Sequence, residues 1–466
     1  MDILVIDLTH GGVKIAISYA KKEKTVYAFD IYNTLNDIDK KMLDAYNVKI
    51  IELSYLKNLK GELKVIYPIH LPLTLDEIKN ENPNLEYTFK THHEAIKELL
   101  DEWEKDILKI EVTGVKGKTS SVFMLKEILI DSNPLILSSL GALLYENKKE
   151  IILQKNISIT PANIKESIDL AYRVANPICG GEKKDRIYNC AIFESSLGAT
   201  GIGDVGLLTN IVENYPIAKN RLTASYAKKQ IFNCNTVNCQ KECFDEYYSN
   251  IKHDKINLFS VNDENANLYT TNIDYSFDKS MIDIEYKNIK TIDDKLLSGK
   301  IQIETFALGP HHVSNVLGVV LTCLTSNIPE NQIKNGLKNY NGIPGRTNKR
   351  NIDGITVIEE INPGINTKAI EESINMISKF DDYYISIGGD YGITCEEIDE
   401  DKVAELINKL NHEIILTGEV GKNISTKVNV PMKYIPDYGE VYNLSIKNQK
   451  NLLFIYRSDY RNITKR

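Results

Sequence analysis

The sequence predicts an α/β protein whose sheets are mainly parallel. Short apolar runs, such as ILVID at residues 3–7 and YYISIGGD at residues 383–390, are followed by Gly-containing turns and amphipathic segments. This alternation is typical of strands that lie buried between helices in a parallel sheet. A further apolar run at residues 107–114 leads into Gly-Lys-Thr at the start of a helical segment, which indicates the same fold class.

The length and the turn signals predict three domains. A chain of 466 residues is long enough for two to four domains of ~150 residues each. We place one boundary after the polar helix expected at residues 91–105, and another at the turn-rich Asn341-Gly-Ile-Pro-Gly345. The predicted domains are a substrate-binding α/β domain at 1–105, an ATP-binding domain at 106–345 and a C-terminal domain at 346–466.

The composition excludes several classes of function. Lys and Arg number 56 against 64 Asp and Glu, so the net charge of −8 argues against a nucleic-acid binder. No apolar run approaches the ~20 residues that would span a membrane, and residues 1–7 are typical of a strand rather than a signal peptide. Seven cysteines, an odd number, fit free thiols in a reducing compartment. We therefore expect a cytoplasmic protein with no membrane partner, whose oligomeric state the sequence does not indicate.

The first domain contains a candidate anion site and half of the histidines. Asp7-Leu-Thr-His-Gly-Gly12 follows the first strand and lacks the Gly-x-Gly-x-x-Gly spacing of dinucleotide loops, so a helix N-terminus that holds a substrate carboxylate or phosphate is expected there. The histidines lie near strand or helix ends, where sites of α/β proteins gather. We favour anion contact over a purely structural role, and no close spacing supports a metal triad. The candidate substrate residues are His10, Gly11, Gly12, His70, His92 and His93.

The second domain begins with a phosphate-binding loop. A strand at residues 110–113 leads into a Gly-containing loop, and Gly-Lys-Thr opens the next helix. Glycines let backbone N–H groups approach phosphate oxygens, and the helix N-terminus adds positive potential. Lys118 would reach the β- and γ-phosphates, and the Thr119 hydroxyl would bind Mg²⁺. Val112 stands where the general motif has glycine. The predicted nucleotide-binding residues are Thr113, Gly114, Val115, Lys116, Gly117, Lys118, Thr119 and Ser120, with ATP and Mg²⁺ as cofactors.

The loop variant T-G-x-x-G-K-T-S resembles that of the Mur ligase and folylpolyglutamate synthase superfamily, whose members activate a carboxylate with ATP. Further motifs follow in the order that the superfamily has them: Glu194-Ser-Ser196, Leu208-Thr-Asn-Ile211, Ala227-Lys228, Gly309-Pro-His-His-Val-Ser-Asn315 and Pro344-Gly-Arg346. The resemblance implies a three-domain Mur ligase-like architecture, with a central P-loop ATPase domain between Rossmann-like N- and C-terminal domains. It also implies that Glu194 binds Mg²⁺, that Lys228 is carbamylated, that His312 and Asn315 contact adenine, and that Arg346 reaches the nucleotide phosphates. Lys118, Glu194, Lys228 and Arg346 are the predicted catalytic residues.

The chain also departs from the superfamily pattern. The histidine that usually follows Thr-Asn-Ile is absent, and Glu213 is the oxygen ligand that could replace it at a second metal site. His312 stands where asparagine is more usual, and residues 359–366 replace an Asp-Tyr-Ala-His segment. Lys228 could instead be an ordinary solvated helix lysine. These departures argue against an ordinary bacterial wall ligase.

Finer motifs resemble an archaeal branch, the Mur-like coenzyme F(430) synthetases of methanogens. They are Asp7-Leu-Thr-His-Gly-Gly12, Thr91-His-His-Glu-Ala95 and Glu360-Ile-Asn-Pro-Gly-Ile-Asn366. The resemblance implies an ADP-forming ligase that activates a propionate of a nickel tetrapyrrole as an acyl phosphate, which a ring carbon attacks to close a carbocyclic ketone. The alternative is a pseudomurein peptide ligase, which joins a nucleotide-linked peptide to an amino acid. A non-catalytic nucleotide-binding partner is a third possibility, which the intact Lys118, Thr119 and Glu194 oppose.

Three cysteines form a C-x4-C-x3-C pattern at Cys234, Cys239 and Cys243. Zinc ribbons prefer paired C-x2-C, so this spacing is weak evidence for a metal. We expect buried thiols there.

Overall fold

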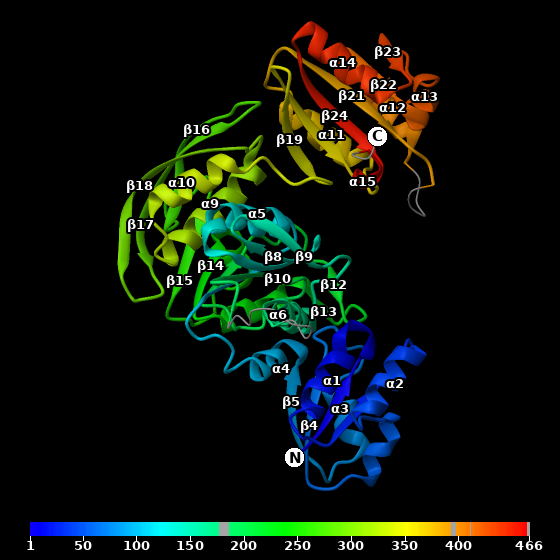
Figure 1. Ribbon diagram of the computed structural model, residues 1–466, viewed down its shortest axis with the longest axis vertical. Coiled ribbons are helices and arrows are strands. Elements are labelled where there is room, and N and C mark those ends of the chain that lie inside the picture. The colour runs from blue at the N-terminus through cyan, green and yellow to red at the C-terminus, as the bar shows by residue number, and fades with distance from the viewer. Residues whose placement is uncertain (177–185, 393–397, 411, 464–466) are drawn as a thin grey trace. The chain divides into compact units, whose positions relative to one another are not determined.

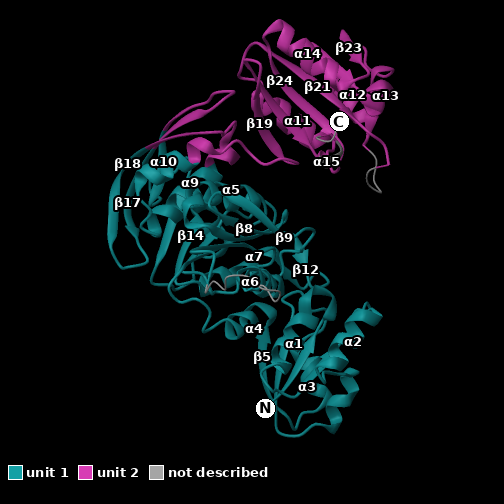
Figure 2. Cartoon of the chain, in the orientation of Figure 1, with its two compact units in different colours: residues 1–271, 284–301, 314–336 teal, residues 272–283, 302–313, 337–466 magenta. Residues whose placement is uncertain are grey.

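The computed structural model describes residues 1–176, 186–392, 398–410 and 412–463. The chain forms two compact units (Figure 2). Unit 1 contains residues 1–271, 284–301 and 314–336, and unit 2 contains residues 272–283, 302–313 and 337–466. The predicted α/β class is confirmed, because most strands in each unit pair in parallel and alternate with helices along the chain. The boundaries at 105 and 345 stay a prediction.

The N-terminal part of unit 1 is a parallel five-stranded sheet in the order β3-β2-β1-β4-β5. Alternate residues of the central β1 are buried in different apolar clusters on the two faces, Ile3 and Val5 on one and Leu4 and Ile6 on the other. The chain passes from β1 to β2 and β3, then crosses to β4 on the opposite side of β1, so the topological switch point lies between β1 and β4. The strands are β1 (Asp2–Ile6), β2 (Val26–Phe29), β3 (Lys49–Ile50), β4 (Glu62–Tyr67) and β5 (Glu86–Thr91).

Helical segments flank this sheet (Figure 1). Two of them begin with a capping box, in which a threonine hydroxyl and a glutamate three residues later satisfy each other's backbone N–H groups: Thr74 with Glu77, and Thr91 with Glu94. The second box fixes the start of α4 and thereby the place of His92 and His93. The segments are η1 (Leu8–Gly12), α1 (Val13–Ala20), α2 (Asp37–Ala45), η2 (Leu53–Asn58), α3 (Leu75–Glu81) and α4 (His92–Leu99).

A second, larger sheet has the order β18-β17-β16-β15-β14-β11-β6-β10-β7-β8-β9. Strand β6, in which five of the six residues are buried, lies between the parallel strands β10 and β11. The segment that follows β6 therefore emerges beside the ends of both neighbours. The strands are β6 (Leu108–Thr113), β7 (Pro134–Ser138), β8 (Gly141–Glu146), β9 (Lys149–Gln154), β10 (Cys190–Glu194), β11 (Val205–Leu208), β14 (Thr236–Gln240), β15 (Ile256–Ser260), β16 (Leu268–Asp274), β17 (Ser280–Lys290) and β18 (Leu296–Thr305). The accompanying elements are α5 (Lys118–Ile128), η3 (Ile130–Ser132), α6 (Pro161–Ala175), the β12–β13 hairpin (Pro216–Ile217, Leu222–Thr223), α7 (Ala224–Lys228), η4 (Lys229–Asn233), α8 (Lys241–Tyr247), α9 (Pro310–Thr325) and α10 (Glu330–Asn339).

A buried carboxylate ties the loop after β10 to β6. Glu111, fully buried in β6, accepts hydrogen bonds from the backbone N–H groups of Thr200, Gly201 and Gly203 and from the Thr200 hydroxyl, at 2.7 to 3.1 Å. A buried charge is tolerated when its oxygens are satisfied in this way. The residues between Glu194 and β11 are therefore held against the centre of the sheet.

Unit 2 contains a six-stranded sheet in the order β19-β20-β24-β21-β22-β23. Among the described strands of this sheet, only the edge strand β19 is antiparallel to its neighbour. The strands are β19 (Thr347–Ile352), β20 (Ile355–Ile361), β21 (Tyr383–Gly389), β22 (Ile414–Thr417), β23 (Met432–Ile435) and β24 (Asn451–Arg457), and the helices are α11 (Thr367–Ile377), α12 (Glu400–Asn408), α13 (Gly418–Ser425), α14 (Tyr438–Asn448) and α15 (Tyr460–Ile463). Among the described residues, no helix of either unit has the length and apolar character needed to cross a bilayer.

Candidate active site

The predicted phosphate loop connects β6 to α5. Gly114 (φ +146°) and Gly117 (φ +84°) both adopt backbone conformations that favour glycine. A Cβ atom at Gly114 would lie 1.9 Å from the Thr209 hydroxyl oxygen, and one at Gly117 would lie 2.0 Å from Asn315 Oδ1. Glycine is therefore required at both positions by the backbone and by the neighbouring side chains.

The segment after β11 holds the loop in place. The backbone N–H of Lys116 donates to Asn210 Oδ1 at 3.0 Å, and that of Val115 donates to the Asn210 carbonyl at 2.9 Å. The Thr209 hydroxyl donates to the Lys116 carbonyl at 2.7 Å. Thr209 and Asn210 belong to the Leu-Thr-Asn-Ile motif, so the structure gives that motif a local role in shaping the loop. Lys118, the first residue of α5, donates from Nζ to the Val115 carbonyl at 3.2 Å.

Oxygen atoms suited to Mg²⁺ converge beside the start of α5. The Thr119 hydroxyl donates to Glu194 Oε1 at 3.1 Å and lies 3.1 Å from the Ser139 hydroxyl. The Ser139 backbone N–H donates to Glu194 Oε2 at 3.1 Å. Hydroxyl and carboxylate oxygens are the donors that Mg²⁺ prefers, so this set fits the ion. Ser139 follows β7 and was missed by the sequence analysis, because a serine after a strand is not by itself a signal.

Glu213, the other predicted metal ligand, is exposed on the segment between β11 and β12. Within the described part of the chain, it does not join a group of three or more His, Cys, Asp or Glu ligand atoms.

Lys228 is the last residue of α7, and its side chain is fully buried. Its Nζ donates to the Ser196 carbonyl, two residues after Glu194. Burial, and then the nearby charge of Lys118, lower the pKa of Lys228 to about 7. Lys228 is therefore not a solvated helix lysine, and a large fraction of it is the neutral amine at neutral pH.

The structure brings the four predicted histidines of the first domain together. His10 comes from η1, His70 follows β4, and His92 and His93 open α4. They line one cavity of about 530 Å³ within unit 1. The rest of the wall is apolar or hydroxylic, with one lysine: Tyr32, Pro68, Ile69, Pro72, Thr160, Pro161, Ser196, Leu197, Tyr215, Ile217, Ala218 and Lys219.

The buried histidines of this cavity are neutral at physiological pH. Burial is the largest cause in each case: it lowers the pKa of His92 to about 4 and that of His93 to about 3, and it also lowers the pKa of His70. His92 is oriented by a 2.9 Å contact between its Nε2 and the Ile6 carbonyl. The neutral ring of His93 could therefore donate one hydrogen bond to an anionic group from Nε2, whereas the single N–H of neutral His92 is already donated to the Ile6 carbonyl.

Gly11 and Gly12 allow close packing at the start of α1. A Cβ atom at Gly11 would lie 2.5 Å from Ala162 Cβ, and one at Gly12 would lie 2.0 Å from the Asp7 carbonyl oxygen. The Asp7 carboxylate accepts from the backbone N–H groups of Thr9 and His10. Two of the amides that could hold an anion there are thus already paired.

The remaining predicted residues are distributed between the units. Asn315 in unit 1 packs against Gly117, as described above. His312 belongs to unit 2, where its Nδ1 accepts from the Leu308 backbone N–H at 3.2 Å, and burial followed by the charge of His311 lowers its pKa. Arg346 is exposed just before β19 of the same unit.

Cys234, Cys239 and Cys243 are buried in an apolar cluster, and burial raises the pKa of the Cys234 and Cys239 thiols, as expected for protonated, unreactive thiols.

The fold is that of the Mur ligases. A crystal structure of MurF from Acinetobacter baumannii superposes with a TM-score of 0.56 at 12% identity, covering 99% of this chain and 92% of that one. The predicted Mur ligase-like α/β architecture is thereby confirmed.

The sequence similarity points to a narrower group of proteins than the fold does. The chain is 28% identical over 456 residues to coenzyme F(430) synthetase of Methanocaldococcus jannaschii, covering 94% of this chain and 95% of that protein. It is 32% identical over 239 residues to coenzyme F(430) synthetase of Methanosarcina acetivorans, covering 49% and 47% of the two chains. Residues 349–459 match the family described as coenzyme F430 synthetase CfbE, C-terminal domain. The predicted resemblance to this branch of the Mur ligases is confirmed, and the likenesses support an ATP-dependent ligase.

Proposed function

We propose that this protein is a coenzyme F(430) synthetase, an ATP-dependent ligase that closes the carbocyclic ketone ring of a nickel seco-tetrapyrrole. The structural observation that carries the proposal is that Ser196 and Lys228 link the histidine cavity to the phosphate loop inside unit 1. Ser196 lines the histidine cavity, its carbonyl accepts from Lys228, and Lys228 lies close enough to Lys118 for the two charges to interact. A carboxylate held in the cavity would therefore face the end of the loop where a γ-phosphate is expected.

The residues of the loop have separate tasks in this proposal. The N-terminus of α5 would cradle the phosphates of ATP, because the backbone N–H groups of Val115 and Lys116 are already paired with Asn210, and the Lys118 ammonium would neutralise charge on the β- and γ-phosphates. Thr119 and Glu194, with Ser139 beside them, would hold Mg²⁺. When bound, Mg²⁺ would supply positive charge to the transferring phosphoryl group. That Arg346 reaches the nucleotide phosphates stays a prediction from the family resemblance.

The reaction that we propose has two steps. A propionate oxygen of the substrate attacks the γ-phosphorus, the bond to the bridging oxygen of ADP breaks, and an acyl phosphate forms. A ring carbon of the same substrate then loses a proton and attacks the acyl carbon, a carbon–carbon bond forms, and phosphate leaves. Exclusion of water from the cavity by the bound substrate would favour this outcome, because water would otherwise hydrolyse the acyl phosphate.

The buried amine of Lys228 supports carbamylation. An amine must be neutral to react with CO₂, and the pKa of about 7 leaves much of Lys228 neutral at the pH of a cell. A carbamate at this position would carry negative charge beside Lys118, whose ammonium would stabilise it. We propose that Lys228 is carbamylated in the active protein and positions Lys118.

The substrate assignment rests on full-length similarity. The relative that this chain matches over nearly its whole length bears the name coenzyme F(430) synthetase, and the matching C-terminal family bears the same name. A pseudomurein peptide ligase is not favoured. The two functions differ in the second reactant, because ring closure within one molecule needs no amino acid.

The test uses the purified chain with Mg²⁺-ATP and the uncyclised nickel tetrapyrrole. We expect one ADP and one phosphate for each product, and a product lighter than the substrate by one water. If the reacting carboxylate carries labelled oxygen, one label should appear in the released phosphate. Product formation without transfer of label would contradict activation as an acyl phosphate. A product that contains an added amino acid would contradict ring closure.

A further inference from the structure

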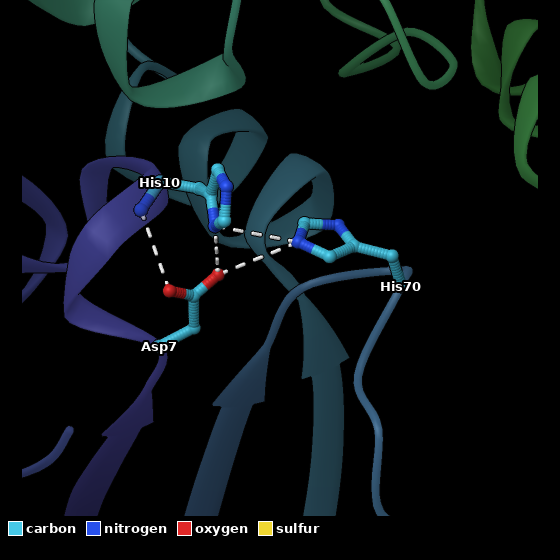
Figure 3. Close-up of side chains that lie close together, drawn as sticks. All are labelled: Asp7, His10 and His70. Carbon is cyan, nitrogen blue, oxygen red and sulfur yellow. Dashed lines mark hydrogen bonds and ion pairs between the residues drawn. The ribbon is translucent and has the colours of Figure 1, made fainter. Parts of the chain in front are cut away.

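Three ligand atoms converge at the mouth of the histidine cavity (Figure 3). Asp7 Oδ2 lies 2.7 Å from His10 Nδ1 and 3.6 Å from His70 Nε2, and the two ring nitrogens are 3.4 Å apart. The Asp7 side chain is fully buried, whereas those of His10 and His70 are 46% and 24% exposed. The three atoms therefore form a small triangle. The acidic side chain that contributes to it is buried, and the two histidine side chains are partly exposed.

The triangle lies at the topological switch point of the five-stranded N-terminal sheet. Asp7 directly follows β1, and His70 lies three residues after the end of β4, the strand that pairs with β1 on the far side of the crossover. Ligands of open α/β sheets bind at this place, beyond the carboxyl ends of the strands where the strand order reverses. Asp7 adopts φ +71°, a conformation that is uncommon outside glycine, and its Oδ1 accepts from the His10 backbone N–H while its Oδ2 faces the rings. The carboxylate is thus oriented by its own loop.

Two of the three separations match those of ligands that share one ion. Three ligands about 2.1 Å from a tetrahedral ion lie about 3.4 Å from one another. The distances of 3.4 and 3.6 Å are close to that value, whereas the 2.7 Å between Asp7 Oδ2 and His10 Nδ1 is that of a hydrogen bond, which a bound ion would replace. Two imidazoles and one carboxylate form a donor set that suits divalent first-row transition metals, whereas Mg²⁺ prefers oxygen alone.

A second observation points to a ligand at the same place. His93 Nε2 lines the cavity and is buried, yet it has no hydrogen-bond partner within the described part of the chain. Buried polar atoms are almost always paired in native proteins. A group that fills the cavity beside His10 and His70 would satisfy this atom.

We propose that Asp7, His10 and His70 bind one divalent transition-metal ion, with its open coordination positions directed into the cavity. Two of the three ligands line the cavity, so that is the side left open. This site is separate from the oxygen ligands at Thr119 and Glu194. It is also distinct from the nickel of a tetrapyrrole, because a macrocycle fills four positions around its metal and leaves one for each face, too few for three protein ligands. The proposal does not require the proposed ligase activity.

Cobalt titration of the purified full-length chain, without ATP or tetrapyrrole, tests the site. We expect one Co²⁺ per chain, visible absorption bands of four- or five-coordinate cobalt, and displacement by Zn²⁺. His70→Asn and His10→Asn should each weaken binding by ~100-fold or more, at least the loss seen when outer-shell partners of a metal are removed. Thr9→Ala, beside His10 but outside the triangle, is the matched control and should bind as the parent does.

Each other outcome overturns the proposal. Binding that persists in both histidine variants but disappears in Glu194→Gln would place the ion at the oxygen ligands near the phosphate loop. A thiolate-to-cobalt charge-transfer band would place it at the cysteines. Absence of cobalt bands in the parent chain would exclude the site. His10 is nearly half exposed, so its variant is expected to fold if that of His70 does not, and the fluorescence of Trp103 in unit 1 verifies folding for each.

Discussion

Replacing His93 by asparagine should remove part of the acid sensitivity of unit 1. His93 is 4% exposed, and burial lowers its pKa from 6.5 to about 3. In the unfolded chain the same ring takes up a proton near pH 6.5, so acid favours unfolding. The stability that neutral His93 supports is fully present above pH 6.5 and is lost as the pH falls from 6.5 through 3. By linkage the loss is about 2 kcal/mol at pH 5 and approaches ~5 kcal/mol below pH 3.

Urea unfolding at pH 8 and pH 5 measures this effect. Trp103 is the only tryptophan of the sequence, and its ring packs against Tyr188 and Phe193 in unit 1, so its fluorescence reports on the unit that contains His93. Between the two pH values, His93→Asn should lose about 2 kcal/mol less unfolding free energy than the parent chain. The variant keeps His92, whose pKa of about 4 leaves it with some acid sensitivity of its own.

His10→Asn, at a nearly half-exposed position of the same unit, serves as the matched control. The reasoning is refuted if His93→Asn and the parent chain lose the same free energy on acidification. It is also refuted if the control removes as much of the pH dependence as His93→Asn does.

Three further predictions concern the phosphate loop and its neighbours. Lys118→Ala should lower ADP formation at least ~100-fold, because a cation on the transferring phosphate is lost, and near-normal ADP release would contradict its role. Gly117→Ala places a Cβ 2.0 Å from Asn315 Oδ1 at a φ of +84°, so we expect ATP affinity in a nucleotide-binding titration to fall at least ~10-fold; unchanged affinity would mean that the loop does not hold the nucleotide. Lys228 becomes neutral as the pH rises through about 7, so activity should rise from pH 6 to pH 8 and respond to added bicarbonate, and Lys228→Met should lose both responses. Equal activity with and without bicarbonate at pH 7 in the parent chain would oppose carbamylation.

The phosphate loop could be predicted because its signal is local. A strand, a glycine loop and Gly-Lys-Thr occupy consecutive positions, and the two glycines are required by the backbone angles of the loop itself. The contacts of Glu194 with Thr119 span 75 residues, and only the resemblance to a family with ordered motifs suggested them. Ser139 joins the same oxygen cluster from a third segment, and nothing in the sequence around it marks it.

The histidine cavity shows which features of the site the sequence could not predict. The sequence placed His10, His70, His92 and His93 near element ends, but their convergence depends on β1 and β4 being neighbours, which is a property of strand order. For the same reason the spacing of the histidines does not indicate a metal triad, and nothing in the sequence around Asp7 marks it as a ligand. The carboxylate and His70 are 63 positions apart in the numbering but 3.6 Å apart in the structure. Burial then lowers the pKa of His70, His92 and His93, an effect that composition does not reveal.

The most direct test of the proposed ligase is ADP release by the purified chain with Mg²⁺-ATP and one acceptor at a time. The account predicts that release requires only the uncyclised nickel tetrapyrrole, that the absorbance of the tetrapyrrole shifts with each turnover, and that Lys118→Ala shows neither change. Release that depends on a nucleotide-linked peptide together with an amino acid, and not on the tetrapyrrole, would contradict it.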